Sequence, residues 1–185
     1  KDAIELFNNV DAKAKGLKVT ADTSSYHLLL NDTELESFNS NLKVNPPLRS
    51  TKDIDALKAG LKDGTLDAVC SDHYTQNIEN KKCEFDIAAF GMINLETSFA
   101  AANTALKGTL STEELVVKLT STPKAILGLD SQTLEEGSLA DITLFNPELK
   151  WTYEQKDIVS KSKNSALTGK SFTGKALAVV NNGQM

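Results

Sequence analysis

Two histidines and one aspartate are the side chains of this sequence best suited to acid–base or metal chemistry. His27 and His73 are the only histidines in the chain, and Asp72 directly precedes His73. An aspartate there can bind a cation and take a proton from a metal-bound water, and imidazole is a common metal ligand. Each residue also has an ordinary explanation: Asp72 could cap a helix or pair with a basic residue, and either histidine could simply pack or orient a neighbour.

Both histidines follow segments that we expect to be strands. Residues 17–21 include Val19 and Thr20, and residues 66–70 (LDAVC) form a compact apolar run typical of a buried parallel strand. In α/β barrels the chemistry lies at the carboxyl ends of the strands, where the loops emerge. Asp72 is therefore placed where a metal ligand or general base would be useful.

A polar residue and a glycine offer further candidate contacts. Asn45 stands before Pro46 and Pro47. Its side-chain amide could form hydrogen bonds to an amide or imide group of a ligand, although Asn before Pro also commonly starts a turn. Phe90 and Gly91 could let a backbone N–H approach a ligand closely, or they could form an ordinary loop ahead of a helix.

Helical segments alternate with the expected strands. Residues 4–14 have helical spacing and end at Gly16, and Ser50 opens a helix that Gly64 stops. Residues 93–106 and 115–119 also read as helices, the second behind a Ser111–Glu114 capping box, and Pro123 starts another short one. Residues 43–49 (KVNPPLR) suit a strand that ends abruptly, whereas residues 31–41 and 77–86 read as loops. Beyond residue 130 the pattern becomes mainly β, with strands at 140–145 and 176–180.

Composition limits the class of protein. The chain has 185 residues, 40% of them hydrophobic, which is enough for one domain or one and a half. Its net charge of -5 gives no general attraction for nucleic acid or an anionic membrane, and no apolar stretch is long enough to span a bilayer. The chain shows no signal peptide and no initiator Met, so Lys1 could mark a cut or a processing site. Cys70 and Cys83 lie in unlike contexts, and we expect two free thiols in a cytoplasmic protein.

Several runs together resemble one family, the class I dihydroorotases of the amidohydrolase superfamily, over their C-terminal portion. The resemblance spans nearly the whole chain, in order and at the right spacing. It rests on TADTSSYHLLL (20–30), LKVNPPLRS (42–50), LKDGTLDAVCSDH (61–73), FGMINLETS (90–98), GSLADITLFNP (137–147) and SKSKNSALTGKSFTGKALAVVNNGQ (160–184).

The resemblance implies an α/β fold, the C-terminal part of a (β/α)8 TIM barrel plus a small β-sandwich segment. Residues 1–130 would belong to the barrel and residues 131–185 to the small β domain. Residues 17–21, 43–46 and 66–70 would be roughly the sixth, seventh and eighth strands. The family's His-x-His pair, its bridging carboxylated lysine or carboxylate and its further histidine have no counterpart in this sequence.

The implied reaction is reversible hydrolysis of dihydroorotate to carbamoyl aspartate in pyrimidine biosynthesis, with one or two zinc ions activating a water. By the match, Asp72 shuttles the proton and can also contact a metal ion, and His27 is a metal ligand. Asn45 contacts the substrate, and the backbone at Phe90 and Gly91 holds its ring. Gln76 stands where the family has a histidine that binds the substrate carboxylate.

Three departures keep other functions open. Tyr26 and Gln76 replace family histidines, and Ala89 replaces a proline. Gln76 can donate a hydrogen bond but carries no charge, so it binds a carboxylate more weakly than a protonated histidine would. The alternatives are a non-catalytic subunit that supports aspartate transcarbamoylase and a hydantoinase-like hydrolase of another cyclic amide. A homodimer is also compatible with the sequence. We expect these 185 residues alone to be inactive, because two protein ligands hold zinc poorly.

Overall fold

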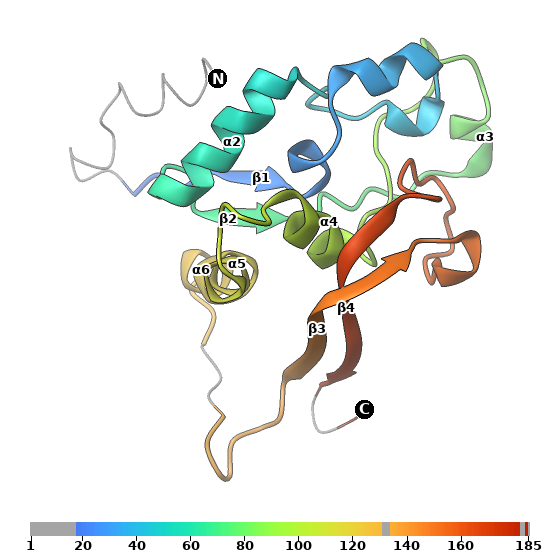
Figure 1. The fold of residues 1–185 in the computed structure, drawn as a ribbon. Helices are drawn as coiled ribbons and strands as arrows, with labels where there is room; N and C mark the ends of the chain where they lie inside the picture. The colour runs from blue at the N-terminus through green and yellow to red at the C-terminus, as the bar shows by residue number, and fades with distance from the viewer. Residues whose placement is uncertain (1–17, 131–133, 182–183, 185) are drawn as a thin grey trace.

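A computed structural model gives the structure of residues 18–130, 134–181 and 184. Its central feature is a pair of parallel strands, β1 (Asp22–Ser24) and β2 (Ala68–Cys70), with Asp22 opposite Ala68 and Ser24 opposite Cys70. Figure 1 shows α2 (Thr51–Asp63) above this pair, and α5 (Thr112–Leu119) and α6 (Ser121–Ile126) below it. The strand–helix–strand order expected from the sequence is confirmed for this unit.

The capping signals in the sequence mark the helices correctly. Ser50 caps α2 by accepting a bond from the backbone of Asp53, and Gly64 ends the helix with a φ of 85°. Because a positive φ strains residues that carry a Cβ, glycine suits this position. The Ser111–Glu114 capping box opens α5, and the helix expected at Pro123 is α6.

Several expected boundaries were wrong. The first strand begins at Asp22, and residues 18–21, the described part of the expected strand, are not in one. The Ala21 N–H donates to the Asp67 side-chain carboxylate at 2.9 Å and not to a backbone carbonyl, so the backbone ladder does not extend over it. Residues 43–46 form no strand; the Lys43 carbonyl accepts instead from Gly91 N–H at 2.9 Å, across a loop. Residues 77–86 include a short helix, α3 (Ile78–Lys81). The helix expected over 93–106 is shorter and begins only at Ser98 (α4, Ser98–Ala105). The backbone N–H groups of Asn94 and Leu95, just before it, donate to the His73 ring instead.

The remaining elements of the described residues are four 3-10 turns and an antiparallel ribbon. The turns are η1 (Tyr26–Leu28), η2 (Asp32–Ser37), η3 (Ser40–Leu42) and η4 (Gln155–Asp157). The ribbon pairs β3 (Ile142–Thr152) with β4 (Ser171–Val180), both longer than the sequence indicated. The expected helix at residues 4–14, with its end at Gly16, lies outside the described residues.

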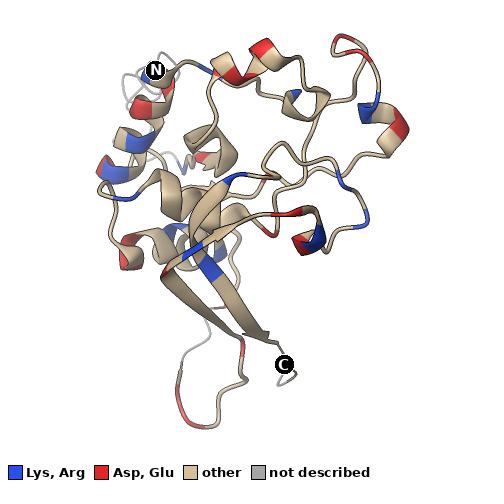
Figure 2. Ribbon diagram, turned by 45° about the vertical axis from the view of Figure 1, so that its right-hand side comes forward, with Lys and Arg blue, Asp and Glu red and all other residues tan. Residues whose placement is uncertain are grey.

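One buried cluster joins the two parts of the chain. Tyr26, Met92 and Ala101 share it with Tyr153 and Phe172 from the ribbon. The Asn103 side chain of α4 also donates to the carbonyls of Pro147 (2.9 Å) and Thr173 (2.8 Å) in the ribbon. The ribbon is therefore packed on α4, and the division into domains at residue 130 stays a prediction. Figure 2 shows acidic and basic residues interspersed over the elements, and no helix in the described ranges is long and apolar enough to cross a membrane.

Candidate active site at the ends of the parallel strands

His27 and Asp72 emerge at the same end of the parallel pair. β1 ends at Ser24 and β2 at Cys70, so the following residues share one edge of the sheet. The buried Tyr26 lies between them: its hydroxyl donates to the Asp72 carboxylate, and its ring centroid is 4.6 Å from that of His27. The tertiary structure thus gathers Tyr26, His27 and Asp72 at one place.

The backbone holds Asp72 in an unusual conformation. Its φ is 46°, in the left-handed region that few residues other than glycine adopt. Asn94, which is fully buried, fixes the strand ends on both sides by donating to Ser25 Oγ and to the Ser71 carbonyl, each at 2.7 Å. Such backbone conformations persist where the surroundings determine them, and they occur often at active sites. The Asp72 carboxylate remains exposed and able to meet a ligand.

The His27 ring has a hydrogen-bond partner at each nitrogen. Burial lowers the pKa of its ring. Its Nε2 lies 2.9 Å from the Pro46 carbonyl and its Nδ1 lies 2.6 Å from Ser24 Oγ. A carbonyl can only accept, so this arrangement assigns the proton to Nε2 and makes the Ser24 hydroxyl a donor to Nδ1. Coordination of a metal through Nε2 would require the other tautomer, in which Nδ1–H donates to the same hydroxyl.

His73 has an orienting role. Its Nδ1 accepts from the backbone N–H groups of Asn94 (3.1 Å) and Leu95 (3.0 Å). These bonds tie the segment after β2 to the segment before α4. Of the two interpretations that the sequence left open for this residue, the structure supports orientation of a neighbour.

The predicted substrate-binding residues lie on two loops near this edge. Gln76 Nε2 donates to the Phe90 carbonyl at 2.8 Å, so these two residues are in contact. Gly91 has a φ of 111°, and a Cβ there would lie 2.6 Å from the Tyr74 ring, so only glycine fits. The N–H of Gly91 already donates to Lys43, and therefore it is not free to bind a ring in this conformation. Asn45 is exposed, and within the described residues its side chain makes no hydrogen bond.

Sequence reasoning overlooked the buried polar residues that support these loops. Asn164 donates to the carbonyls of Tyr74 (3.1 Å) and Gly91 (3.3 Å) and accepts from Gln76 N–H. Asn94 joins the two strand ends, and the buried Lys81 ammonium lies under the Phe90 loop. Asn94 and Asn164 stand inside two of the quoted motifs, INLETS and SKSKN, which was the available signal.

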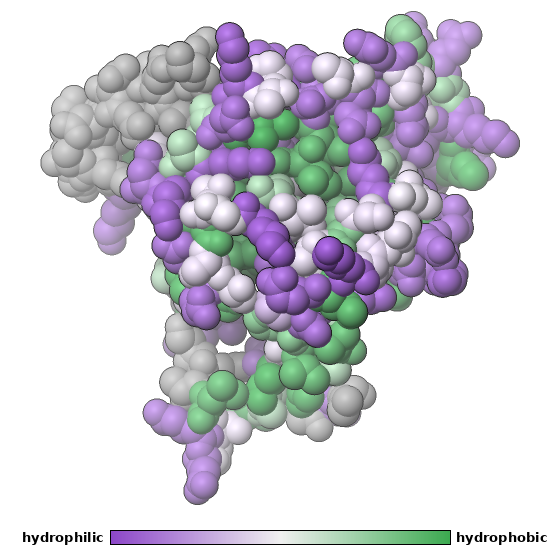
Figure 3. All heavy atoms as spheres, viewed as in Figure 1, coloured by the Kyte–Doolittle hydropathy of each residue, from purple (hydrophilic) through white to green (hydrophobic). Residues whose placement is uncertain are grey.

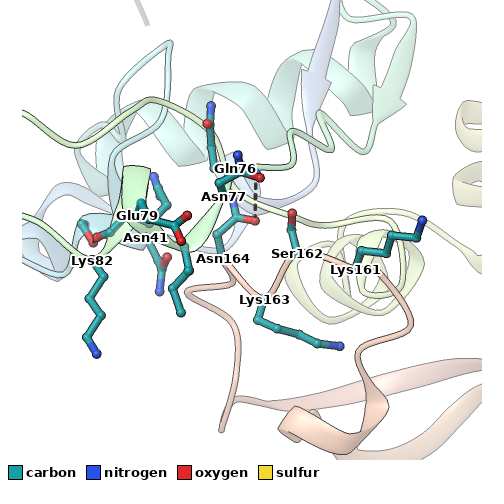
Figure 4. Close-up of a pocket in the computed structure, with 12 residues that line it drawn as sticks. Asn41, Gln76, Asn77, Glu79, Lys82, Lys161, Ser162, Lys163 and Asn164 are labelled. Atoms are coloured by element: carbon teal, nitrogen blue, oxygen red, sulfur yellow. Dashed lines mark hydrogen bonds between the residues drawn. The ribbon is translucent and has the colours of Figure 1, made fainter.

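A hollow of about 620 Å³ adjoins this region without containing the strand-end residues. It is lined by residues from 40–41, 76–82 and 161–164, so Gln76 and Asn164 border it, whereas His27, Asn45 and Asp72 do not. In Figure 4 the side chains of Lys82, Lys161 and Lys163 point in different directions, without converging on a common centre. The hollow thus lies beside the loops, and the arrangement of its lysines does not indicate an anion-binding site.

The residues fit part of a metal site. Asp72 offers an oxygen, and His27 can offer Nε2 once that atom gives up its bond to the Pro46 carbonyl; both atom types are acceptable to zinc. Within the described ranges no group of three or more His, Cys, Asp or Glu side chains could hold a metal ion. Since zinc sites in proteins normally have three or four protein ligands, the others would have to come from elsewhere.

Two parallel strands with covering helices, and polar residues gathered at their carboxyl ends, are the arrangement of an α/β barrel segment. The chain belongs to the amidohydrolase family, whose sequence pattern matches residues 4–185. It is 45% identical to a dihydroorotase of Ruminiclostridium cellulolyticum over 168 residues, which are 90% of this chain and 39% of that protein. It is 40% identical to a dihydroorotase of Citrifermentans bemidjiense over 176 residues, 95% of this chain and 42% of that protein.

Among solved structures, an L-hydantoinase from Arthrobacter aurescens superimposes with a TM-score of 0.82 at 26% identity, covering 100% of this chain and 43% of that one. The chain therefore spans about two fifths of the length of these relatives. The expected resemblance to a C-terminal portion of dihydroorotases and the expected barrel fold class are both confirmed.

Proposed function

We propose that these residues form part of a dihydroorotase, a cyclic amidohydrolase that interconverts dihydroorotate and carbamoyl aspartate in pyrimidine synthesis. The observation that carries the proposal is the exposed Asp72 carboxylate at a barrel strand end, fixed by Tyr26 and neighboured by the His27 imidazole. The choice of substrate is supported by the dihydroorotases that the chain resembles over 90–95% of its length.

Asp72 is the proton carrier in this proposal. It takes a proton from the water that attacks the ring carbonyl carbon and delivers it to the ring nitrogen as the C–N bond breaks; the reverse reaction uses the same carboxylate. Zinc, held by His27, Asp72 and ligands outside the described residues, would polarise that water. Tyr26 donates to one carboxylate oxygen, Oδ2, and so leaves Oδ1 for the proton transfer.

Substrate recognition falls to the two loops. Asn45 has an exposed amide on the first loop. On the second loop, the Gln76 side chain donates a hydrogen bond to the Phe90 carbonyl. A neutral amide at Gln76 gives a weaker bond to a carboxylate than a cation would. We therefore expect a higher KM for dihydroorotate than an enzyme with a cation at this position would have.

One contact favours a second candidate function. The Gln76 amide that would meet the substrate is bonded to the Phe90 carbonyl, as expected for a loop that no longer binds a charged ligand. A non-catalytic subunit that binds aspartate transcarbamoylase, or that forms a homodimer, would be compatible with this. The hydantoinase-like fold also leaves open another cyclic amide as substrate.

Zinc content and turnover of the protein at its natural full length decide among these functions. A dihydroorotase holds one or two zinc ions and turns over dihydroorotate faster than hydantoin. A hydantoinase-like enzyme reverses that preference, and a non-catalytic subunit shows neither zinc nor turnover. Zinc-free protein without turnover would contradict the proposal.

Replacement of the proton carrier gives the residue-level test. Asp72→Asn keeps the size of the side chain but removes the base, and we expect kcat to fall by roughly several hundredfold. The matched control is Asp55→Asn, on the exposed side of α2, which should leave kcat unchanged. An unaffected rate in Asp72→Asn would exclude this role.

A further inference from the structure

Lys81 is the only charged residue that is buried within the described part of the chain. It is 4% exposed and ends the short helix α3. Burial, and then repulsion by the nearby Lys43 ammonium, lowers the pKa of Lys81 to about 8, while Cys83 raises it slightly. Because burial of a lysine costs free energy, its retention here requires compensating contacts.

The contacts of Lys81 are two backbone carbonyls from different loops. Its Nζ donates to the Ala89 carbonyl at 2.8 Å and to the Lys43 carbonyl at 3.3 Å. Ala89 directly precedes Phe90 and Gly91, and Lys43 stands two residues before Asn45. One ammonium group therefore bridges the two segments to which substrate contacts are assigned.

Backbone hydrogen bonds close to Lys81 also join these segments. Gly91 N–H donates to the Lys43 carbonyl at 2.9 Å, and Ala89 N–H donates to the Asn80 carbonyl at 3.0 Å. Lys43 Nζ lies 5.0 Å from the centre of the Phe90 ring and donates to the Asp86 carbonyl. None of these bonds replaces Lys81, because only its side chain reaches both Ala89 and Lys43.

We propose that Lys81 is a positioning residue for substrate binding: its ammonium fixes the Phe90–Gly91 loop against the Asn45 segment and so sets the width of the space between them. The inference rests on the proposed function for its substrate, a cyclic amide. It extends that function to a residue outside the strand ends, which acts through the loops without touching the reacting atoms.

The test compares Lys81→Met with Lys82→Met in the full-length protein. Both remove an ammonium, but Lys82 is exposed, and no side-chain contact of it contributes to the bridge. For Lys81→Met we expect KM for dihydroorotate to rise about tenfold while kcat changes less than about threefold, since binding geometry is lost and the proton carrier is untouched. Lys82→Met should match wild type. An unchanged KM in Lys81→Met, whatever happens to kcat, would overturn the inference.

A second measurement needs no turnover. Hydrogen–deuterium exchange of the Ala89 and Gly91 amides should become at least about tenfold faster in Lys81→Met, while the amides of α5 keep their wild-type rates. Unchanged exchange at the loop would refute the bridging role. If the wild-type protein has no dihydroorotase activity, the proposed function fails, and the exchange result alone still decides whether Lys81 positions the loop.

A conservative variant guards against a simple loss of folding. Lys81→Arg keeps a charged donor and should return both KM and loop exchange toward wild type. If Lys81→Met unfolds below the assay temperature, Lys81→Gln, a neutral donor of shorter reach, is expected to show an intermediate rise in KM. Wild-type KM and loop exchange in Lys81→Gln would count against the inference.

Discussion

Tyr26 differs from the resembled family at a residue that touches the proposed proton carrier. Its ring is fully buried, and its hydroxyl reaches the exposed Asp72 carboxylate. Burial, and then the bond to Asp72, raises the pKa of the phenol far above its usual value, so the phenol stays protonated and remains a donor. A tyrosine here can thus orient Asp72 without competing for protons near neutral pH.

Tyr26→Phe tests that role at the residue scale. Removal of the hydroxyl should lower the free energy of unfolding by only about 1 kcal/mol, since water can solvate the carboxylate that loses its partner. We expect kcat to fall by roughly tenfold, because Asp72 would then sample other orientations. Urea unfolding and steady-state kinetics measure the two effects. Tyr153→Phe, at a buried tyrosine in the other part of the chain, is the control and should keep its kcat; an equal loss there would argue against a specific role for Tyr26.

At the scale of elements, the loop from residue 74 to residue 92 depends on its closing turn. Gly91 needs a positive φ and also lies against Tyr74. Gly108 has a similar φ of 83°, but a Cβ added to it would meet no atom within 4 Å. The two glycines therefore separate backbone strain from steric overlap.

Gly91→Ala should cost about 2–3 kcal/mol of unfolding free energy, while Gly108→Ala should cost about 1 kcal/mol, because only the first adds a clash to the strain. In the full-length protein, Gly91→Ala should also raise KM, since Gln76 and Phe90 would be displaced with the loop. Thermal or urea unfolding of both variants gives the comparison. Equal costs would mean that the Tyr74 contact relaxes freely.

At the scale of the whole molecule, the ribbon presents apolar side chains on both faces. Ile142 and Leu144 point to one side, and Leu177 and Val179 to the other, each at least 40% exposed. Figure 3 shows apolar residues gathered on the lower projection of the molecule, on the face turned to the viewer. β1 pairs only with β2 among the described strands, so one edge of β1 also lacks a strand partner. Exposed strand edges and apolar patches favour association.

We therefore expect the isolated 185-residue chain to self-associate and to hold zinc weakly. Light scattering should give a mass above the 20.0 kDa of the monomer, and equilibrium dialysis should find less than about one zinc per chain at micromolar zinc, because His27 and Asp72 supply two ligands where three or four are usual. The control is the full-length protein at the same concentration. A folded, zinc-loaded monomer of these residues with activity would contradict this expectation.

The sequence by itself determined the helices with strong local signals, the buried strand β2 and the family. Ser50, Gly64 and the Ser111–Glu114 box act within a few residues of the backbone groups they satisfy, so their effects can be read locally. The positions of His27 and Asp72 after strands could be predicted for the same reason, although the first strand was placed a few residues too early.

Only the tertiary structure decided what those residues touch. Tyr26 and Asp72 are 46 residues apart, and the register of β1 against β2 brings them into contact. The sequence left Lys81 in a charged loop, yet it is buried because two distant carbonyls compensate its desolvation. Contacts of this kind depend on long-range packing and on exclusion of water, and neither leaves a periodic or local pattern in the sequence.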